Sequence, residues 1–174
     1  LGMFSNNHRL TASEGQTLAG FLDSGGRLYM EGGDTWAFDP TTAVHPYFNI
    51  AGLDDGTGDA GPINGVAGTL TEGMSFSYQG ENSWVDRLAP VGTATPVFEN
   101  GSPVYINGIA YDGGSYRTIG TSFELGGLVD GSGPSSRQEL LRRILEWFGF
   151  SDSSLLFEDG FESGDTTMWS YTVP

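Results

Sequence analysis

A ten-residue stretch at positions 27–36, RLYMEGGDTW, contains the first residues that could do chemistry. A short apolar strand there ends in Glu31, two glycines and Asp34, and Trp36 follows. Ligands bind beyond the carboxyl ends of the strands of an open parallel sheet. Glu31 could act there as a general base or nucleophile, with Asp34 and Trp36 contacting a substrate, or the two carboxylates could bind a metal. The alternative is a tight turn, in which Glu31 accepts backbone N–H groups and Asp34 caps the next turn.

His8 and His45 are the two histidines of the chain and the candidate partners of Glu31. His8 follows a possible first strand at residues 1–4, so it could reach the same rim, and His45 lies downstream of the turn. A Glu–His pair can carry out general acid–base chemistry near neutral pH, because histidine titrates there. The catalytic hypothesis therefore combines Glu31 with His8 or His45. The alternative is that both histidines are surface or packing residues.

An acidic loop, DDGTGD at residues 54–59, has the composition of a calcium site. Ca²⁺ prefers hard oxygen ligands, and Asp54, Asp55 and Asp59 could supply them. The loop lacks the complete spacing of an EF-hand and its distant Glu. We therefore predict either a structural Ca²⁺ bound by these three residues or a mobile glycine-rich loop.

Several aromatic residues could line a groove for a sugar or a peptide, since exposed aromatic clusters mark binding sites. The alternative is that they belong to the core. The candidates are Trp36, Phe38, Tyr47, Phe48, Tyr78 and Trp84.

The composition excludes several function classes. The net charge is −15 with only seven basic residues, which argues against binding nucleic acid, because a phosphate backbone requires Lys and Arg. The chain has no cysteine, which removes disulfides, thiolate nucleophiles and cysteine-based zinc sites. No apolar run is long enough to span a membrane. With 37% hydrophobic residues the chain can nevertheless build a core.

The elements that must position these residues are clearest near the two ends. Thr11 and Glu14 form a capping-box pattern before an apolar helical stripe, and residues 27–30 predict the next strand. A hairpin is predicted at 105–123 around Asp112-Gly113, and a second capping box at 136–139 begins a helix that Gly149 ends. Between them, short strands are predicted around 66–70, 75–78 and 95–98. We predict two parts: an α/β domain at 1–150 and a linker or tail at 151–174.

Three segments together resemble a known family. They are LAGFLDSGGRLYMEGGD at 18–34, YRTIGTSFELGGL at 116–128 and SRQELLRRILEWFGF at 136–150. They look like the flavodoxin-like domains related to class I glutamine amidotransferases, of the kind found in secreted bacterial peptidases and other exported multidomain proteins. The resemblance implies an open α/β sheet with flanking helices and extra β-hairpins in the middle. Such a domain would lack its first strand here, so the chain would be a fragment or a partner would supply that strand.

The resemblance also implies what the chain does not do. Catalytic amidotransferases carry a Cys on the sharp strand-to-helix turn, and here Glu31 stands at the corresponding turn. Glutaminase chemistry is therefore excluded. The tail LFEDGFESGDTTMWS at 156–170 resembles segments of secreted bacterial proteins, which implies a secreted or periplasmic location.

The favoured function is a non-catalytic accessory or interaction domain of an exported bacterial protein. Its expected partners are other domains of a larger protein or another copy of the chain. One alternative is a hydrolase of an ester, lactone or amide bond that uses Glu31 with a histidine. A second alternative is a carbohydrate-binding module. Ca²⁺ is the one cofactor that the residues suggest.

Overall fold

The computed structural model describes residues 1–2 and 9–150 of the chain. His8 and the predicted tail at 151–174 lie outside the described residues. The division of the chain at residue 150 therefore stays a prediction.

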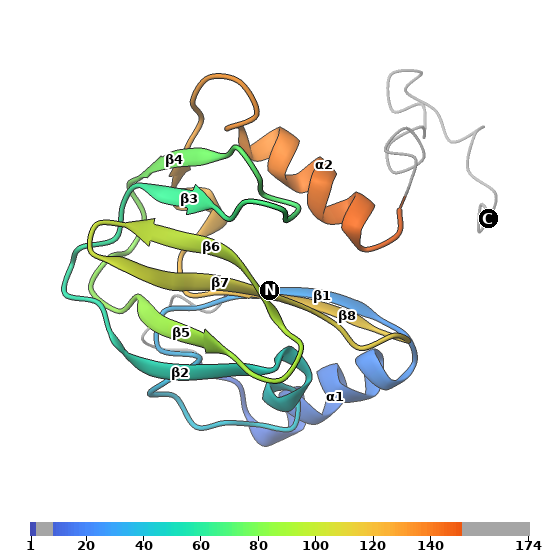
Figure 1. Cartoon of the computed structure of the whole chain (residues 1–174). Helices are drawn as coiled ribbons and strands as arrows, with labels where there is room; N and C mark the ends of the chain where they lie inside the picture. Colours follow the sequence, from blue (N-terminus) through green and yellow to red (C-terminus); the bar gives the residue numbers. More distant parts are fainter. Residues whose placement is uncertain (3–8, 151–174) are drawn as a thin grey trace, which may run out of the picture.

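The described chain forms a curled, mixed β-sheet with an α-helix near each of its two ends (Figure 1). The helices are α1 (Ala12–Asp23) and α2 (Arg137–Trp147), and two short 3-10 helices are η1 (His45–Phe48) and η2 (Leu125–Gly127). The strands are β1 (Arg27–Glu31), β2 (Ile50–Asp55), β3 (Ile63–Gly65), β4 (Ser75–Tyr78), β5 (Asp86–Pro90), β6 (Thr95–Gly101), β7 (Val104–Asp112), β8 (Arg117–Thr121) and β9 (Leu128–Val129). No helix among these residues is long and apolar enough to cross a membrane.

The two predicted helices form, and their first turns show why. In α1 the capping box is complete: Thr11 Oγ1 accepts from Glu14 N–H at 3.3 Å, and Thr11 N–H donates to Glu14 Oε2 at 2.8 Å. In α2 only half of the predicted box forms. Ser136 Oγ accepts from Glu139 N–H at 3.1 Å, but the Glu139 carboxylate is held by Arg142 and Arg143 one turn later.

The predicted hairpin is also confirmed. β7 pairs with β8 in antiparallel register from Gly108↔Thr121 to Asp112↔Arg117. Asp112 Oδ1 accepts from Gly114 N–H at 2.9 Å, and Gly114 has a φ of +82°, which few other residues adopt without strain. Of the three middle strands, 75–78 is confirmed as β4 and 95–98 lies within β6. The strand predicted at 66–70 is wrong, because β3 ends at Gly65 and turns follow it.

The long strand β7 lies at the centre of the sheet. Two different strands pair along one edge of β7, so the sheet forks there. β6 pairs with β7 along one edge. On the other edge, β8 pairs with residues 108–112 of β7, while β5 pairs at Ile106. From there β8 continues to β1, and β5 continues to β2 (Figure 1). The sheet therefore divides into two arms at Asn107, between these two pairings.

The predicted flavodoxin-like, amidotransferase-like open sheet is wrong. That fold alternates parallel strands with helices. Among the described residues, β1 and β8 are the one pair of named strands that run parallel, and the other ladders are antiparallel. The result is a curled half-barrel (Figure 1). The prediction failed because one helix–strand unit at 12–31 was taken for a repeating pattern, whereas residues 38–103 form turns and antiparallel strands.

The start of the chain adds a short parallel partner to β1. The Leu1 ammonium donates to Tyr29 O at 3.0 Å, and Glu31 N–H donates to Leu1 O at 2.9 Å. Gly2 forms a parallel bridge with Glu31. The outer edge of β1 is therefore covered beside the carboxyl end of the strand.

Two apolar clusters fill the two faces of the sheet. Ile109 and Ala110 are neighbours on β7 and belong to different clusters, as expected for successive strand residues that point to opposite faces. One cluster lies under α2 and includes Phe98, Phe123, Leu140 and Ile144. The other lies under α1 and η1 and includes Leu22, Met30, Trp36 and Phe48.

Candidate metal centre

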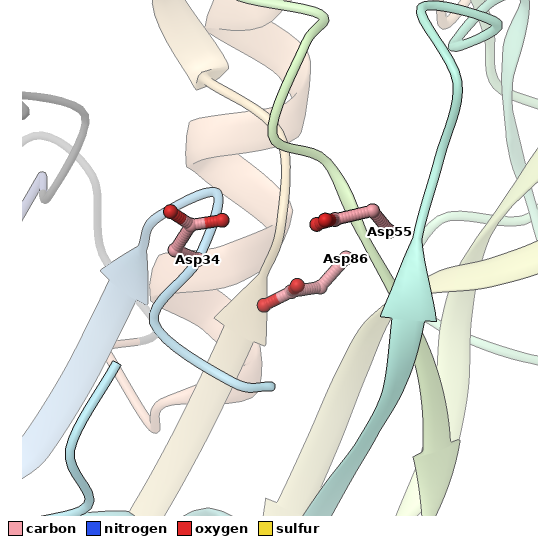
Figure 2. Close-up of side chains that lie close together, drawn as sticks. All are labelled: Asp34, Asp55 and Asp86. Carbon is pink, nitrogen blue, oxygen red and sulfur yellow. The ribbon is translucent and has the colours of Figure 1, made fainter. Parts of the chain in front are cut away.

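Three aspartates meet where the two arms of the sheet separate. Asp55 ends β2 and Asp86 begins β5, and antiparallel pairing places them directly opposite each other. Asp34 lies in the turn after β1. Each offers a carboxylate oxygen, and these oxygens lie within 4.8 Å of one another. Figure 2 shows the three carboxylates turned toward a common space.

Backbone hydrogen bonds fix the loop that brings Asp34 to this place. Gly32 N–H donates to Thr121 O at 3.1 Å, and the Trp36 indole N–H donates to the same oxygen at 2.9 Å. Ser122, the next residue, donates from its hydroxyl to Asp86 O at 2.6 Å. The end of β8 thus holds the Asp34 loop on one side and the start of β5 on the other.

Asp86 is the buried member of the cluster. Its side chain is 0% exposed, and its Oδ2 accepts from the N–H groups of Trp36 and Ala37, both at 3.0 Å. Its Oδ1 is buried and has no hydrogen-bond partner. Burial, and next the charges of Asp34 and Asp55, raise the pKa of the Asp86 carboxyl to about 8, while the two N–H groups act in the opposite direction.

The pKa values of Asp55 and Asp34 are raised as well. Asp55 Oδ1 is also buried without a hydrogen-bond partner. Burial, followed by the charge of Asp54, raises the pKa of Asp55. Burial also raises the pKa of Asp34, and the charges of Asp55 and Asp39 add to it. Like charges directly opposite each other destabilise a sheet, so this arrangement requires a compensating positive charge or protons.

A divalent cation would compensate the negative charge of these carboxylates, and their oxygens suit it as ligands. All the converging atoms are hard carboxylate oxygens, which Ca²⁺ and Mg²⁺ prefer over the nitrogen and sulfur ligands typical of zinc. Ca²⁺ binds oxygens at 2.3–2.6 Å and tolerates irregular geometry. Oxygens that lie within 4.8 Å of one another can therefore share one Ca²⁺.

The predicted catalytic pair does not form with the described histidine. Glu31 Oε2 accepts from Leu125 N–H at 2.7 Å and from the Tyr29 hydroxyl at 3.0 Å, so Glu31 ties β1 to η2. His45 begins η1, and its Nδ1 accepts from Thr42 N–H at 2.9 Å. Burial lowers the pKa of His45, which keeps the imidazole neutral at pH 7. His8, the other predicted partner, lies outside the described residues, so the hydrolase alternative stays a prediction.

The acidic loop at 54–59 contributes one of its three predicted ligands to the cluster. Asp55 is part of it. Asp54 Oδ1 instead accepts from Asp55 N–H at 3.0 Å. Asp59 accepts from the Tyr105 hydroxyl at 3.0 Å and faces Arg87 at 3.5 Å.

The sequence predicted Asp34 either as a substrate contact or, together with Glu31, as a metal ligand, and Asp86 was not predicted at all. A signal for Asp86 exists: it lies two residues before the buried Leu88 and therefore on the apolar face of β5. A carboxylate on the apolar face of a strand is costly unless it is paired or binds a metal. Trp36, the other predicted substrate contact, is 7% exposed and packs edge-on against Phe48 at 5.0 Å. It supports the site from the core.

Gly33 allows the Asp34 loop to pack against the chain before β5. A Cβ atom at position 33 would lie 2.4 Å from Trp84 O and 3.0 Å from Trp84 Cβ. The requirement is close approach, because Gly33 is not among the glycines with positive φ. We expect Gly33→Ala to lower the free energy of unfolding by about 1–3 kcal/mol, as overpacking does. Urea denaturation would measure it.

Gly126→Ala is the matched control, since a Cβ atom there meets nothing within 4 Å. Equal stability of the two variants would contradict the packing of the Asp34 loop on Trp84.

Comparisons with known proteins give the fold and leave the family open. No protein-family model matches the sequence, and no curated protein matches it significantly. Among solved structures, the chain is similar to the N-terminal domain of mmIFT52, with a TM-score of 0.58 at 16% identity over 87% of this chain and 77% of that chain. It is also similar to a cold-adapted β-galactosidase from Rahnella sp. R3, with a TM-score of 0.54 at 15% identity over 78% of this chain. A third is the exo-β-1,4-mannosidase Op5Man5 from Opitutaceae bacterium strain TAV5, with a TM-score of 0.52 at 10% identity over 86% of this chain.

The chain spans 21% of the β-galactosidase and 24% of the mannosidase. At these identities the likeness concerns the fold alone. These neighbours support the correction of the flavodoxin-like prediction, and they transfer no activity to this chain.

Proposed function

We propose that this domain is a non-catalytic accessory domain that binds a divalent cation, Ca²⁺, at Asp34, Asp55 and Asp86. The observation that carries the proposal is the buried Asp86 Oδ1, which has no hydrogen-bond partner and lies beside two more carboxylates. A buried, unpaired carboxylate is too costly to retain without a compensating group. A bound cation would supply that group and tie the loop after β1 to β2 and β5.

Two further observations support an accessory role. Glu31, the one predicted catalytic carboxylate, is bound to Leu125 and Tyr29 within the fold. The two glycosidases with a similar fold contain it as about a fifth to a quarter of a longer chain. We therefore propose that the domain serves as one module of a larger exported bacterial protein.

The direct test is Ca²⁺ binding to the purified full chain, measured by isothermal titration calorimetry and thermal unfolding after chelation. Ca²⁺ at about 100 times its dissociation constant stabilises the folded state by about 2.7 kcal/mol. For a domain of this size we expect a rise in Tm of about 5–10 °C. Mg²⁺ should give a smaller rise, because it demands near-octahedral geometry and keeps several of its waters.

Asp86→Asn is the decisive variant and Asp54→Asn is its control. Both replace a carboxyl group with an amide of the same shape, but the structure places only Asp86 in the cluster. The proposal predicts that Asp86→Asn abolishes the calcium-dependent rise and that Asp54→Asn retains most of it. If the wild-type chain shows no heat of binding and no rise in Tm with Ca²⁺, the proposed function is wrong.

A further inference from the structure

The three aspartates leave part of the coordination shell of a bound Ca²⁺ open. Asp86 Oδ2 already accepts two N–H groups, so Asp86 offers one oxygen, Oδ1. Asp34 and Asp55 can offer at most two oxygens each, which gives five at most. Because Ca²⁺ takes six to eight oxygen ligands, at least one position remains at six-fold coordination and at least two remain at seven-fold or eight-fold coordination, for water or ligand oxygens. Asp34 and Asp55 are partly exposed, so these positions face solvent.

Exposed apolar side chains come from the same three segments as the aspartates. Phe38, four residues after Asp34, is 56% exposed. Leu53, two residues before Asp55, is 65% exposed, and Trp84, two residues before Asp86, is 45% exposed. Of the three, Trp84 lies beside the Asp34 loop, since a Cβ atom on Gly33 would lie 3.0 Å from Trp84 Cβ. A large exposed apolar side chain beside a polar site is suited to ligand binding. The backbone of Trp84 is fixed beside the Asp34 loop. It packs on Gly33, and its backbone N–H donates to Glu81 Oε2 at 3.1 Å.

The charge around the site selects against anionic ligands. Asp39 and Glu81 also act on Asp34, and Arg9 is the one opposing charge among the groups that shift its pKa. One Ca²⁺ neutralises two of the three aspartates, and the whole chain carries a net charge of −15. A phosphate or a peptide carboxylate would therefore approach against a negative field. A neutral ligand with several adjacent hydroxyl groups would not.

We propose that the Ca²⁺ site binds a carbohydrate, with two adjacent hydroxyl groups of one sugar ring ligating the ion and the Trp84 indole packing against the ring. This inference rests on the proposed function. A pyranose has a polar edge of hydroxyl groups and an apolar C–H face, which match a cation beside an indole. The aromatic residue adds apolar contact area, and the ion fixes the orientation of the hydroxyls.

The test is titration of the calcium-loaded full chain with D-mannose, D-galactose and D-glucose, followed by tryptophan fluorescence and saturation-transfer NMR. We expect at least one sugar to bind in Ca²⁺ and none to bind in EDTA or to Asp86→Asn. Trp84→Ala should weaken binding tenfold or more, and Trp84→Tyr, which retains an aromatic platform, should restore most of it. Phe150→Ala is the control, because Phe150 is similarly exposed, at 47%, but lies beyond α2.

The outcomes separate the two proposals. If Ca²⁺ binds but none of the three sugars does, the carbohydrate inference is overturned and the cation site stands. Sugar binding that is equally strong in EDTA would also overturn the inference, since the ion would then have no part in it. If Ca²⁺ itself does not bind, both proposals fail.

Discussion

Replacing Phe123 with alanine is expected to lower the free energy of unfolding by about 3–5 kcal/mol. Phe123 is 0% exposed and lies in the cluster under α2. Its ring packs edge-on against Phe98, with centroids 5.2 Å apart, and against Tyr78 at 6.2 Å. Removing it leaves a cavity that these rings cannot fill without moving. Urea denaturation followed by circular dichroism would measure the loss.

Replacing Phe123 should also disturb the candidate metal centre, because Phe123 lies next to residues that hold the start of β5. Phe123 follows Ser122, whose hydroxyl holds the start of β5, and Phe123 O accepts from the Thr121 hydroxyl at 3.1 Å. Phe150→Ala serves as the control, because Phe150 is 47% exposed and should cost little. Similar losses for both variants would mean that Phe123 is not a core residue.

The second large effect is a pH dependence of stability in the absence of divalent cations. The pKa of Asp86 rises from an ordinary value of 3.8 to about 8 in the folded chain, chiefly through burial. Between these values the unfolded chain has released the proton and the folded chain still holds it. Stability therefore falls as the pH rises from about 4 to 8, by up to about 1.4 kcal/mol per pH unit from this group.

Asp86→Asn should remove that slope. The amide oxygen can keep the bonds from Trp36 and Ala37, and the amide N–H groups can face Asp34 and Asp55. In EDTA at pH 8 the variant is therefore expected to be more stable than the wild-type chain. Urea denaturation at a series of pH values checks both statements. A slope that is the same in the wild-type chain and in Asp86→Asn would show that Asp86 is ionised in the folded chain without a cation.

The sequence by itself determined the local elements and several exclusions. The Thr11–Glu14 capping box, the Ser136 cap of α2 and the turn at Asp112 each depend on residues within a few positions of one another. These patterns have local physical causes, so they could be predicted without the fold. The absence of cysteine excludes thiol chemistry by this chain in the same way, and the high negative charge argues against nucleic-acid binding, which stays a prediction.

Local patterns did not determine how the strands assemble. The helix–strand unit at 12–31 fits a doubly wound α/β sheet and a curled mixed sheet equally well, since the difference lies in which distant strands pair. β1 pairs with β8, about 90 positions later in the chain. The flavodoxin-like prediction extended a local pattern to a nonlocal arrangement, and the antiparallel middle strands overturn it.

The candidate metal centre was decided by tertiary structure alone. Asp55 was found from its acidic loop and Asp34 from its turn, but as members of two different sites. The register of β2 on β5 places Asp86 opposite Asp55, and the fork at Asn107 admits the Asp34 loop. Register depends on the packing of whole strand faces, which a linear pattern does not contain. The sequence shows that the three aspartates are present, but only the tertiary structure shows that their carboxylates lie together.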